Sequence, residues 1–407
     1  MITMAIDNKD KKVLKSSIER EQNEVACSAE CEKIKGSKNL NVPPLRFPEF
    51  SGEWEKRTLE DVSEFSKERM NTQNLSSDNY VATENMLHDY QGIIEASSVP
   101  TNTNVIKFNK GDVLLSNIRP YLKKVWFADK NGGCSADVFV FKALSACIPD
   151  FLHYIIANDR FINFAMSGAK GVKMPRGDKE QMKTYEIGLP SIEEQKKIAK
   201  LLSLLDERIT TQNKIIEDLK KLKSAISLKM LHSDSWEQFS IKDIAIIGRG
   251  RVISSVEISQ QKNPTYPVYS SQTSNEGIMG YLDDYMFEGE YISWTTDGAN
   301  AGTVFYRNGK FNCTNVCGLL KLKKGFDTHF VSLVLAEVTK KYVSINLANP
   351  KLMNNTMGKI QIRLPKLEEQ KRTSLVFRRL HKLLATHNSL LTEYSKQKQY
   401  LLSQMFI

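Results

Sequence analysis

Two short segments in the first half of the chain carry side chains that could bind DNA. The segment 117–124 follows a run of strand-forming residues and supplies Asn117, Arg119, Tyr121, Lys123 and Lys124. The glycine-rich segment 167–177 supplies Lys170, Lys173 and Arg176. Amide and guanidinium groups can hydrogen-bond to base edges, cations contact phosphates, and glycine lets the backbone approach closely. We therefore predict that these segments form a nucleic-acid contact.

The second half carries polar segments at the equivalent places. Residues 293–302 supply Thr295, Thr296 and Asn300, and residues 346–355 supply Lys351 and Asn354. Arg249 and Arg251 lie in the run 248–251, which we interpret as a further phosphate-facing loop. Any one of these residues could equally belong to a solvated surface loop. Their paired placement in both halves favours binding.

Patterns that would indicate catalysis are weak. The run 263–266, Asn-Pro-Thr-Tyr, is similar to the Asn/Asp-Pro-Pro-Tyr/Phe motif of adenine methyltransferases, but its third residue differs. No glycine-rich cofactor loop precedes it, so a turn explains it better. The phosphate-binding pattern G-x-x-x-x-G-K-[ST] and a Ser/His/Asp or Cys/His set are missing, and Cys313, Cys317 and His329 lack a fourth zinc ligand nearby. We expect no catalytic residue, metal or cofactor in this chain.

A duplicated motif indicates how these segments are positioned. The run L-P-S-I-E-E-Q-K that begins at Leu189 returns 175 residues later as L-P-K-L-E-E-Q-K, beginning at Leu364. Shorter echoes accompany it, such as residues 110–116 with 288–293. Self-similarity at a fixed spacing indicates a tandem duplication.

Each repeat combines short strands and helices. Strand-forming residues bounded by turn residues predict strands at 111–116, 138–141, 289–294, 302–306 and 318–322. Apolar spacing predicts helices at 150–163 and 328–342. We therefore expect an α+β fold with two similar globular α/β domains in tandem, each followed by a long helix.

The long helices carry the clearest periodicity. Alternate steps of four and three residues meet apolar side chains at eight of ten positions from Ile198, and at seven of ten from Thr373. This 3.5-residue seam predicts a coiled coil, and its polar breaks suggest a fixed register. The breaks recur at equivalent positions, Gln212 with His387 and Lys223 with Lys398. Ser191 and Glu194 form a capping box at the first helix start.

We expect the two helices to pair antiparallel within one chain, which relates the halves by a pseudo-twofold axis. Packing of each helix on its own domain, or on another chain, is the alternative. The expected organisation is a mobile N-terminal extension at 1–40, with a short helix around 13–24, a first domain at 41–190, a first helix at 191–232, a second domain at 233–365 and a second helix at 366–407.

Bulk properties agree with this organisation. The chain has 407 residues, a formal net charge of +10 and 41% hydrophobic residues. The length suits two or three domains, and the basic balance suits a polyanionic partner, although other soluble proteins reach it. We find no apolar run that could span a membrane and no secretory signal. We expect a cytoplasmic protein whose six cysteines stay reduced.

Residues 41–407 resemble the specificity (S) subunits of type I restriction-modification enzymes. The likeness rests on the tandem domain-plus-helix layout, the duplicated Leu-Pro-x-x-x-Glu-Gln-Lys helix starts and runs such as 111–120. It implies that each domain is a target-recognition domain that reads one part of a split double-stranded DNA target. The loops differ between the halves, so we expect an asymmetric target.

The resemblance also implies a set of partners. The helices would set the spacer between the two parts of the target and dock modification (M) subunits, expected to be two. Restriction (R) subunits would join through them, and S-adenosylmethionine, ATP and Mg would act on these partners, so that this chain itself catalyses nothing. Two alternatives stay open: a stand-alone adenine-specific DNA methyltransferase with its own recognition domains, and a coiled-coil scaffold with no DNA role.

Overall fold

The computed structural model describes residues 41–344 and 349–407. The described residues divide into two compact units, the first formed by 41–204 with Lys398–Ile407 and the second by 205–344 and 349–397. Each unit has its own hydrophobic core. The expected extension at 1–40, with its short helix, lies outside the described residues.

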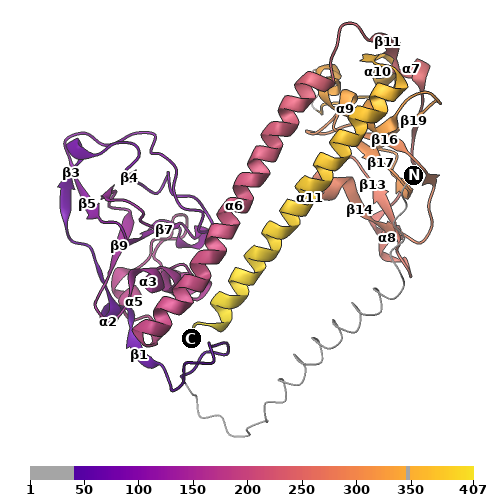
Figure 1. The fold of residues 1–407 in the computed structure, drawn as a ribbon. Coiled ribbons are helices and arrows are strands. Elements are labelled where there is room, and N and C mark those ends of the chain that lie inside the picture. Colours follow the sequence, from indigo (N-terminus) through magenta and orange to yellow (C-terminus); the bar gives the residue numbers. More distant parts are fainter. Residues whose placement is uncertain (1–40, 345–348) are drawn as a thin grey trace, which may run out of the picture. The chain divides into compact units, whose positions relative to one another are not determined.

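The first unit contains two four-stranded sheets and a two-stranded ribbon (Figure 1). One sheet has the order β2-β9-β6-β7 and is antiparallel throughout. The other has the order β3-β5-β8-β4, in which β4 and β8 run parallel. The strands are β1 (Glu55–Thr58), β2 (Ser63–Phe65), β3 (Arg69–Asn71), β4 (Tyr80–Val81), β5 (Asn104–Phe108), β6 (Val113–Ser116), β7 (Val125–Phe127), β8 (Gly132–Cys134), β9 (Val138–Ala143) and β10 (Glu186–Leu189), and β1 pairs with β10.

The second unit repeats this plan. Its sheets have the orders β12-β19-β16-β17 and β14-β13-β18-β15, and β11 pairs with β20 as the ribbon. The strands are β11 (Glu237–Ser240), β12 (Ala245–Arg249), β13 (Tyr266–Tyr269), β14 (Ile278–Leu282), β15 (Phe287–Glu288), β16 (Tyr291–Thr295), β17 (Val304–Arg307), β18 (Lys310–Cys313), β19 (Cys317–Leu322) and β20 (Gln361–Leu364).

The two units share topology but differ at one sheet edge. The sheets β2-β9-β6-β7 and β12-β19-β16-β17 correspond strand for strand. In the second sheet of each unit a parallel pair, β4 with β8 or β13 with β18, is followed by one antiparallel strand. The fourth strand is β3 beside β5 in one unit and β14 beside β13 in the other. The predicted duplication of an α/β domain is therefore confirmed.

Strand β6 shows why these runs are so apolar. Val113 and Leu115 lie in the main core of the unit, whereas Leu114 lies in the smaller core behind the sheet. Side chains of a strand alternate between the two faces, so a strand buried on both faces has no polar position. The expected strands at 111–116 and 138–141 match β6 and β9.

The helix expected at 150–163 is instead two helices, α3 (Pro149–Ile156) and α4 (Asp159–Ser167). Asn158 interrupts it, because its backbone is extended and its side chain accepts a hydrogen bond from the amide of Arg160. Asparagine is a preferred N-cap residue, and this cap outweighs the continuous apolar spacing. In the second unit α9 (Thr328–Val338) ends in a 3-10 turn, η4 (Thr339–Tyr342).

The remaining helices are short, apart from the two long ones. They are α2 (Leu59–Val62), α5 (Lys179–Lys183), α7 (Ile241–Ile244), α8 (Ser255–Ser259) and α10 (Asn354–Lys359), with 3-10 turns η1 (Thr72–Asn74), η2 (Pro120–Leu122) and η3 (Ser274–Gly277). The long helices are α6 (Ile192–Met230) and α11 (Leu367–Gln404). Both begin within one residue of the predicted starts.

The glutamine of the duplicated motif anchors each long helix to its own domain. Buried Gln195 accepts a hydrogen bond from the amide of Ile148 at 2.9 Å and donates to the carbonyl of Pro190 at 3.0 Å. Buried Gln370 likewise accepts from the amide of Asp327 at 2.9 Å and donates to Pro365 at 2.8 Å. One side chain thus connects the helix start to the turn before α3 or α9.

The predicted capping box at Ser191 is only half formed. The amide of Glu194 donates to the hydroxyl of Ser191 at 3.3 Å. The carboxylate of Glu194 is buried and receives Nε and Nη2 of Arg46, at 2.8 and 2.7 Å, instead of capping the helix. The lead-in segment before the first strand is therefore fastened to α6.

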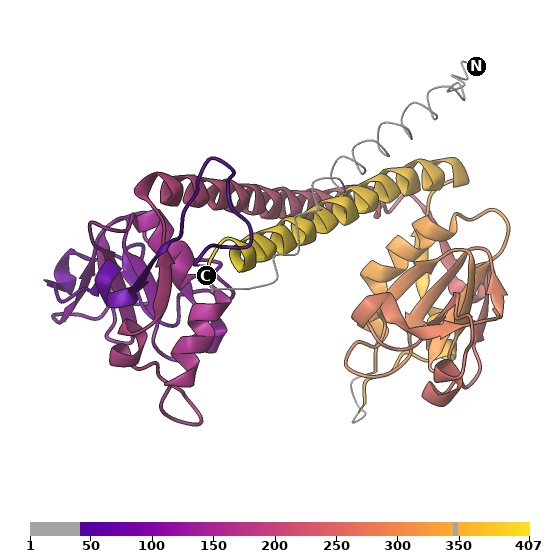
Figure 2. The same cartoon turned by 90° about the horizontal axis from the view of Figure 1, so that it is seen from below.

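Within the second unit the two long helices pair antiparallel, as Figures 1 and 2 illustrate. Gln212 lies against His387, and the guanidinium of Arg208, one turn earlier on α6, lies 5.9 Å from the ring centre of Tyr394, further along α11. Gln212 and His387 occupy equivalent places in the two repeats, so a local twofold axis relating the helices passes between them. The other polar break is different, because Lys398 lies over the ring of Tyr154 in the first unit.

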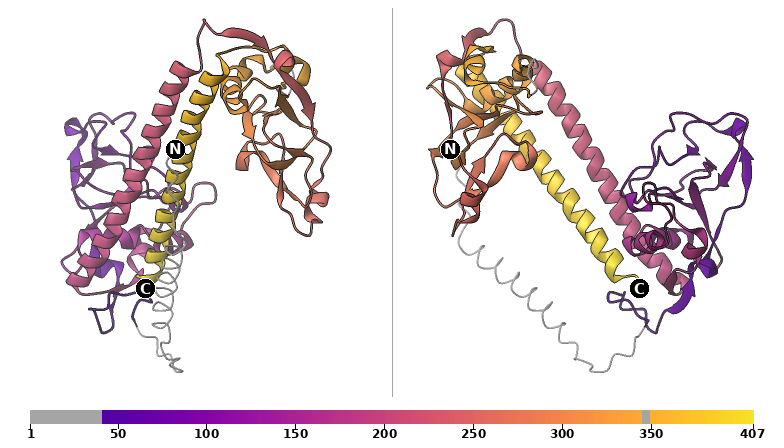
Figure 3. Two further views of the ribbon diagram at one scale, coloured as in Figure 1. Left: turned by 45° about the vertical axis from the view of Figure 1, so that its right-hand side comes forward. Right: turned by 180° about the vertical axis from the view of Figure 1, so that it is seen from behind.

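The C-terminal end of the chain completes the first unit. Leu402, Met405 and Phe406 belong to its core. The amide of Leu45 donates to the carbonyl of Gln404 at 3.0 Å, so the C-terminus lies beside the start of the described chain (Figure 3).

Candidate nucleic-acid interface

The two binding segments predicted in the first half lie side by side in the first unit. The amide of Arg119 donates to the carbonyl of Pro175 at 2.8 Å, and the amide of Gly177 donates to the carbonyl of Asn117 at 3.2 Å. Backbone bonds hold the segments irrespective of their side chains. The side chains of the two segments can therefore differ without loss of this backbone arrangement, which we call the two-segment frame.

The second of these segments is a hairpin, which Figure 2 shows as a magenta loop that projects from its unit. Lys170 and Arg176 exchange two backbone hydrogen bonds of 2.9 Å, which close the turn. Gly171 has φ +96°, a conformation that favours glycine, and a Cβ there would lie 3.3 Å from the carbonyl oxygen of Met174. The glycine that sequence reasoning assigned to phosphate approach is thus required by the turn.

Acidic residues at the base of the hairpin pair with two of its cations. Lys170 lies 2.6 Å from Asp178, and Arg176 lies 3.3 Å from Asp137. Sequence reasoning missed both carboxylates. Hydrogen bonding from Lys170 lowers the pKa of Asp178. Exposed pairs of this kind are weak, so phosphate could replace either carboxylate. Lys173 makes no ion pair with any residue that the structure describes.

The second unit builds the same frame from different residues. The amide of Gly298 donates to the carbonyl of Pro350 at 3.1 Å, and the amide of Leu352 donates to the carbonyl of Thr296 at 2.8 Å. Ser344 and Lys351 exchange backbone hydrogen bonds at 2.9 and 3.3 Å, as Lys170 and Arg176 do. Residues 345–348 lie outside the described part of the chain. Both halves therefore carry the two segments at equivalent places, and in each half the two segments lie side by side.

Left-handed backbone holds the first segment in its shape. Arg119 and Lys123, which flank η2, have φ of 53° and 54°. Non-glycine residues in this region cost of order 1 kcal/mol or more and cluster at functional sites. The ammonium of Lys123 lies 2.9 Å from Asp159, which also accepts a hydrogen bond from the hydroxyl of Tyr90 at 2.8 Å. Burial acts to raise the pKa of Asp159, but these two bonds outweigh it and lower the pKa.

Two buried polar atoms at this site lack a hydrogen-bond partner among the described residues. They are Oδ1 of Asn117 and Nε of Arg119. An unsatisfied buried group costs roughly 1–3 kcal/mol unless water or a ligand supplies its partner. Tyr121 in the same segment is 49% exposed. These three predicted residues offer an acceptor, a guanidinium donor and a ring.

Lys124, which was predicted to bind DNA, is not exposed for that role. Its side chain is buried, and its ammonium donates to the carbonyl of Thr83 at 2.7 Å. Burial lowers the pKa of Lys124. The residue stabilises the domain from inside and does not face a ligand.

Thr295 and Thr296, which were also predicted to bind DNA, are buried as well. Thr295 is fully buried and its hydroxyl donates to the carbonyl of Asn300, while the hydroxyl of Thr296 donates to the carbonyl of Val316 at 2.7 Å. They continue the buried strand β16 and hold its following turn. Asn300 is exposed, and its amide donates to the hydroxyl of Thr273 at 3.0 Å. Of the three predicted residues in this segment, only Asn300 faces solvent.

Arg249 and Asn354 meet, although they are far apart in sequence. Nε of Arg249 donates to Oδ1 of Asn354 at 3.0 Å, and Nη1 donates to the carbonyl of Asn315 at 3.1 Å. The arginine thus connects the end of β12 to the start of α10. Lys351, which is half-buried, lies three residues before Asn354 in the same segment.

In the run 248–251, Gly250 packs closely against Cys313 and Arg251 pairs with a carboxylate. Arg251 forms an ion pair with Glu257, and hydrogen bonding to Arg251 lowers the pKa of that carboxylate. A Cβ on Gly250 would lie 1.5 Å from the carbonyl oxygen of Cys313. Glycine is needed there for close packing on the turn after β18. The phosphate-facing role of Arg249 and Arg251 stays a prediction.

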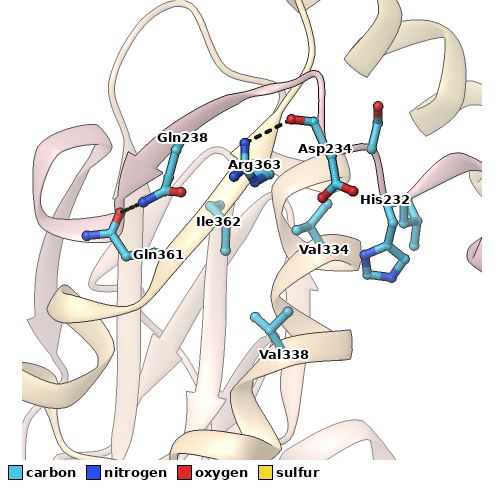
Figure 4. A pocket seen from close by; sticks show the side chains of 10 residues that line it. His232, Asp234, Gln238, Val334, Val338, Gln361, Ile362 and Arg363 are labelled. Atoms are coloured by element: carbon cyan, nitrogen blue, oxygen red, sulfur yellow. Dashed lines mark hydrogen bonds between the residues drawn. The ribbon is translucent and has the colours of Figure 1, made fainter.

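A pocket lies where α6 leads into β11, lined by residues 231–234 and Gln238 and by residues of α9 and β20 (Figure 4). Its polar groups bond to one another, as when Arg363 donates to the carbonyl of Asp234 at 3.0 Å. Among residues 41–344 and 349–407, no cluster of His, Cys, Asp or Glu is arranged to hold a metal. The run 263–266 leads into β13, as a turn would.

None of the described helices is both long and apolar enough to cross a membrane.

Comparison with known proteins gives the family. The model of the type I restriction modification DNA specificity domain matches twice, at residues 51–221 and 233–393. The chain belongs to this family. The type I specificity subunit S.MpnORF201P of Mycoplasma pneumoniae is 37% identical over 206 residues, which cover 50% of this chain and 85% of that protein. The specificity subunit of the type I restriction enzyme MpnII is 43% identical over 150 residues, 36% of this chain and 44% of that protein.

Solved structures confirm the fold of the specificity family. The S subunit of a type I restriction-modification system from M. genitalium matches with a TM-score of 0.68 and 18% identity, covering 90% of this chain and 99% of that one. A chain from a type I restriction-modification complex matches with a TM-score of 0.51 and 18% identity, covering 86% and 97%.

Proposed function

We propose that this chain is the DNA specificity subunit of a type I restriction-modification complex, and that each unit reads one part of a split target. The repeated two-segment frame carries this proposal. Arg119–Pro175 in one unit and Gly298–Pro350 in the other use the same backbone bond to hold different side chains. A common frame with different side chains suits two different short sequences, so we propose an asymmetric target.

Charge supports DNA as the ligand. The chain carries a formal net charge of +10, and the first frame presents Lys170, Lys173 and Arg176 on one hairpin. Cations that replace counterions on phosphates make binding fall steeply with salt. We propose that these residues contact phosphates, and that Asn117, Arg119, Tyr121 and Asn300 contact base edges.

The long helices would set the gap between the two parts of the target and dock M subunits. On α11, Val376, Leu383 and Leu390 recur every seven residues and are 39%, 43% and 39% exposed. An exposed apolar stripe with heptad spacing is the kind of surface that another helix covers. Because the chain is duplicated, we propose two M subunits, with R subunits joining through them.

Catalysis would belong to these partners. We propose that S-adenosylmethionine, ATP and Mg act on the M and R subunits, and that this chain acts in the cytoplasm without chemistry of its own. The chain's contribution would be to choose the site and to position the methyltransferase.

Methylome sequencing of cells with and without this chain tests the proposal. The expected result is one bipartite adenine-methylated sequence that depends on the chain. Exchanging Leu383 for Asp should prevent assembly with M subunits, whereas the matched change Leu228→Asp, at a 77% exposed leucine near the end of α6, should not. A chain-dependent motif that is short and continuous would contradict the proposal.

The stand-alone methyltransferase is the second candidate. Incubation of the purified chain with S-adenosylmethionine and DNA separates the two, since methyl transfer without a partner would favour this alternative. A scaffold without a DNA role would bind M subunits but leave their DNA affinity unchanged.

A further inference from the structure

The hairpin of the first unit presents apolar side chains where cations alone would suit a phosphate contact. Val172 at its tip is fully exposed, and Met174 is 52% exposed. Lys173 lies between them in the sequence, and Lys170 and Arg176 close the hairpin. Electrostatic attraction would bring this tip to DNA, but the attraction gives no reason for a valine there.

The tip is held in place by the surrounding structure. The backbone pair of Lys170 with Arg176 closes the hairpin, and the amide of Arg119 fixes the carbonyl of Pro175. A side chain on such a support is positioned before the ligand arrives, so little ordering entropy opposes its contact.

We propose that this hairpin enters the major groove at the first part of the target and that Val172 contacts the C5-methyl group of a thymine. This inference rests on the proposed function. The hairpin is a narrow loop closed by one backbone pair, Lys170 with Arg176. Such a loop with its side chains fits the major groove, roughly 12 Å wide, better than the minor groove, about 6 Å wide. Thymine presents the one apolar group that unmodified bases display in the major groove, and small apolar side chains recognise it.

Thymine-to-uracil replacement tests the contact, because it removes only the methyl group. The full chain, assembled with its M subunits, is titrated with synthetic duplexes that carry the methylome-defined target and one deoxyuridine at a time. Loss of one buried methyl contact should weaken binding about three- to tenfold at one thymine of the first part of the target. With Val172→Ala that same replacement should change affinity by less than about twofold.

A matched exchange controls for exposed apolar surface in general. Ile94 is 55% exposed in the same unit and outside both segments, so Ile94→Ala should keep the uracil effect. Val172→Ala should unfold like the wild type, because the side chain is already in solvent.

The outcomes separate this inference from the function beneath it. If the wild-type complex shows no preference for the target duplex, the proposed function fails. If it binds the target but tolerates uracil at every thymine of the first part, the inference about Val172 is overturned while the function stands. A uracil effect that persists in Val172→Ala also overturns it, because another group then reads the methyl.

Discussion

Gln212 donates hydrogen bonds to both Nδ1 and the backbone carbonyl of His387, at 2.5 and 2.9 Å, and the two residues are 175 positions apart. This separation equals the repeat length of the chain. A residue can meet its own repeat equivalent only on the axis that relates the two copies. The polar break in each seam therefore marks the centre of the antiparallel pair.

Gln212 and His387 should stabilise the fold only when both side chains are present. Gln212→Ala removes the donor to Nδ1 of half-buried His387 and should cost about 1 kcal/mol, while the double change to Leu should be nearly neutral or stabilising. Urea unfolding of the full chain measures both. Ser224→Ala, at an exposed position of the same helix, serves as the control. Wild-type stability in Gln212→Ala would contradict this account.

Lys173 and Lys124 should differ although both were predicted to bind DNA. Lys173→Ala should weaken binding to all sequences and reduce the salt slope by about one, because one phosphate contact is lost. Lys124→Met should lower the stability of the domain but leave the salt slope of the folded protein unchanged, since its ammonium is buried on Thr83. Fluorescence anisotropy between low and moderate salt compares them, with exposed Lys110→Ala as control. Equal salt slopes for Lys173→Ala and Lys124→Met would contradict the different roles assigned to the two lysines.

Lys123 combines strain with an ion pair, and two substitutions separate them. Glycine suits φ 54° and alanine does not, so Lys123→Gly should be more stable than Lys123→Ala by about 1 kcal/mol. Both lose the pair with Asp159. Thermal unfolding gives the difference. Identical melting temperatures would mean that the left-handed backbone is not retained in solution.

Stability of the second unit should fall in mild acid because of His329. Burial, with Arg378 and His381 nearby, lowers the pKa of His329 from 6.5 to about 4. Protons then bind the unfolded chain first, so stability is complete above pH 6.5 and is lost as the pH falls towards 4. At pH 5 the loss should be on the order of 2 kcal/mol. Urea midpoints at pH 7 and 5 test it: His329→Phe should flatten the difference, and exposed His232→Gln should not.

Much of the architecture follows from local sequence signals. The duplicated Leu-Pro start, the heptad seam and the apolar strands β6 and β9 are patterns of neighbouring residues, and all appear as expected. The break at Asn158 was missed because apolar spacing hides a cap that one side chain provides.

The site was less accessible to such reasoning. Lys124 reaches a carbonyl 41 residues away, and Arg249 reaches an amide 105 residues away. Thr295 and Thr296 resemble a polar loop in the sequence but are buried, and their backbones bond to Thr303 and Leu352. Partners of this kind depend on tertiary contacts that no local pattern encodes.

The most direct test of the account is the methylome of cells in which α6 is extended. Insertion of four residues within the seam of α6 (Ile192–Met230) adds about one helical turn, near 5.4 Å. The account predicts that both parts of the methylated sequence stay the same and that the gap between them changes by about one or two base pairs, at roughly 3.4 Å each. Retained methylation with an unchanged gap would contradict it.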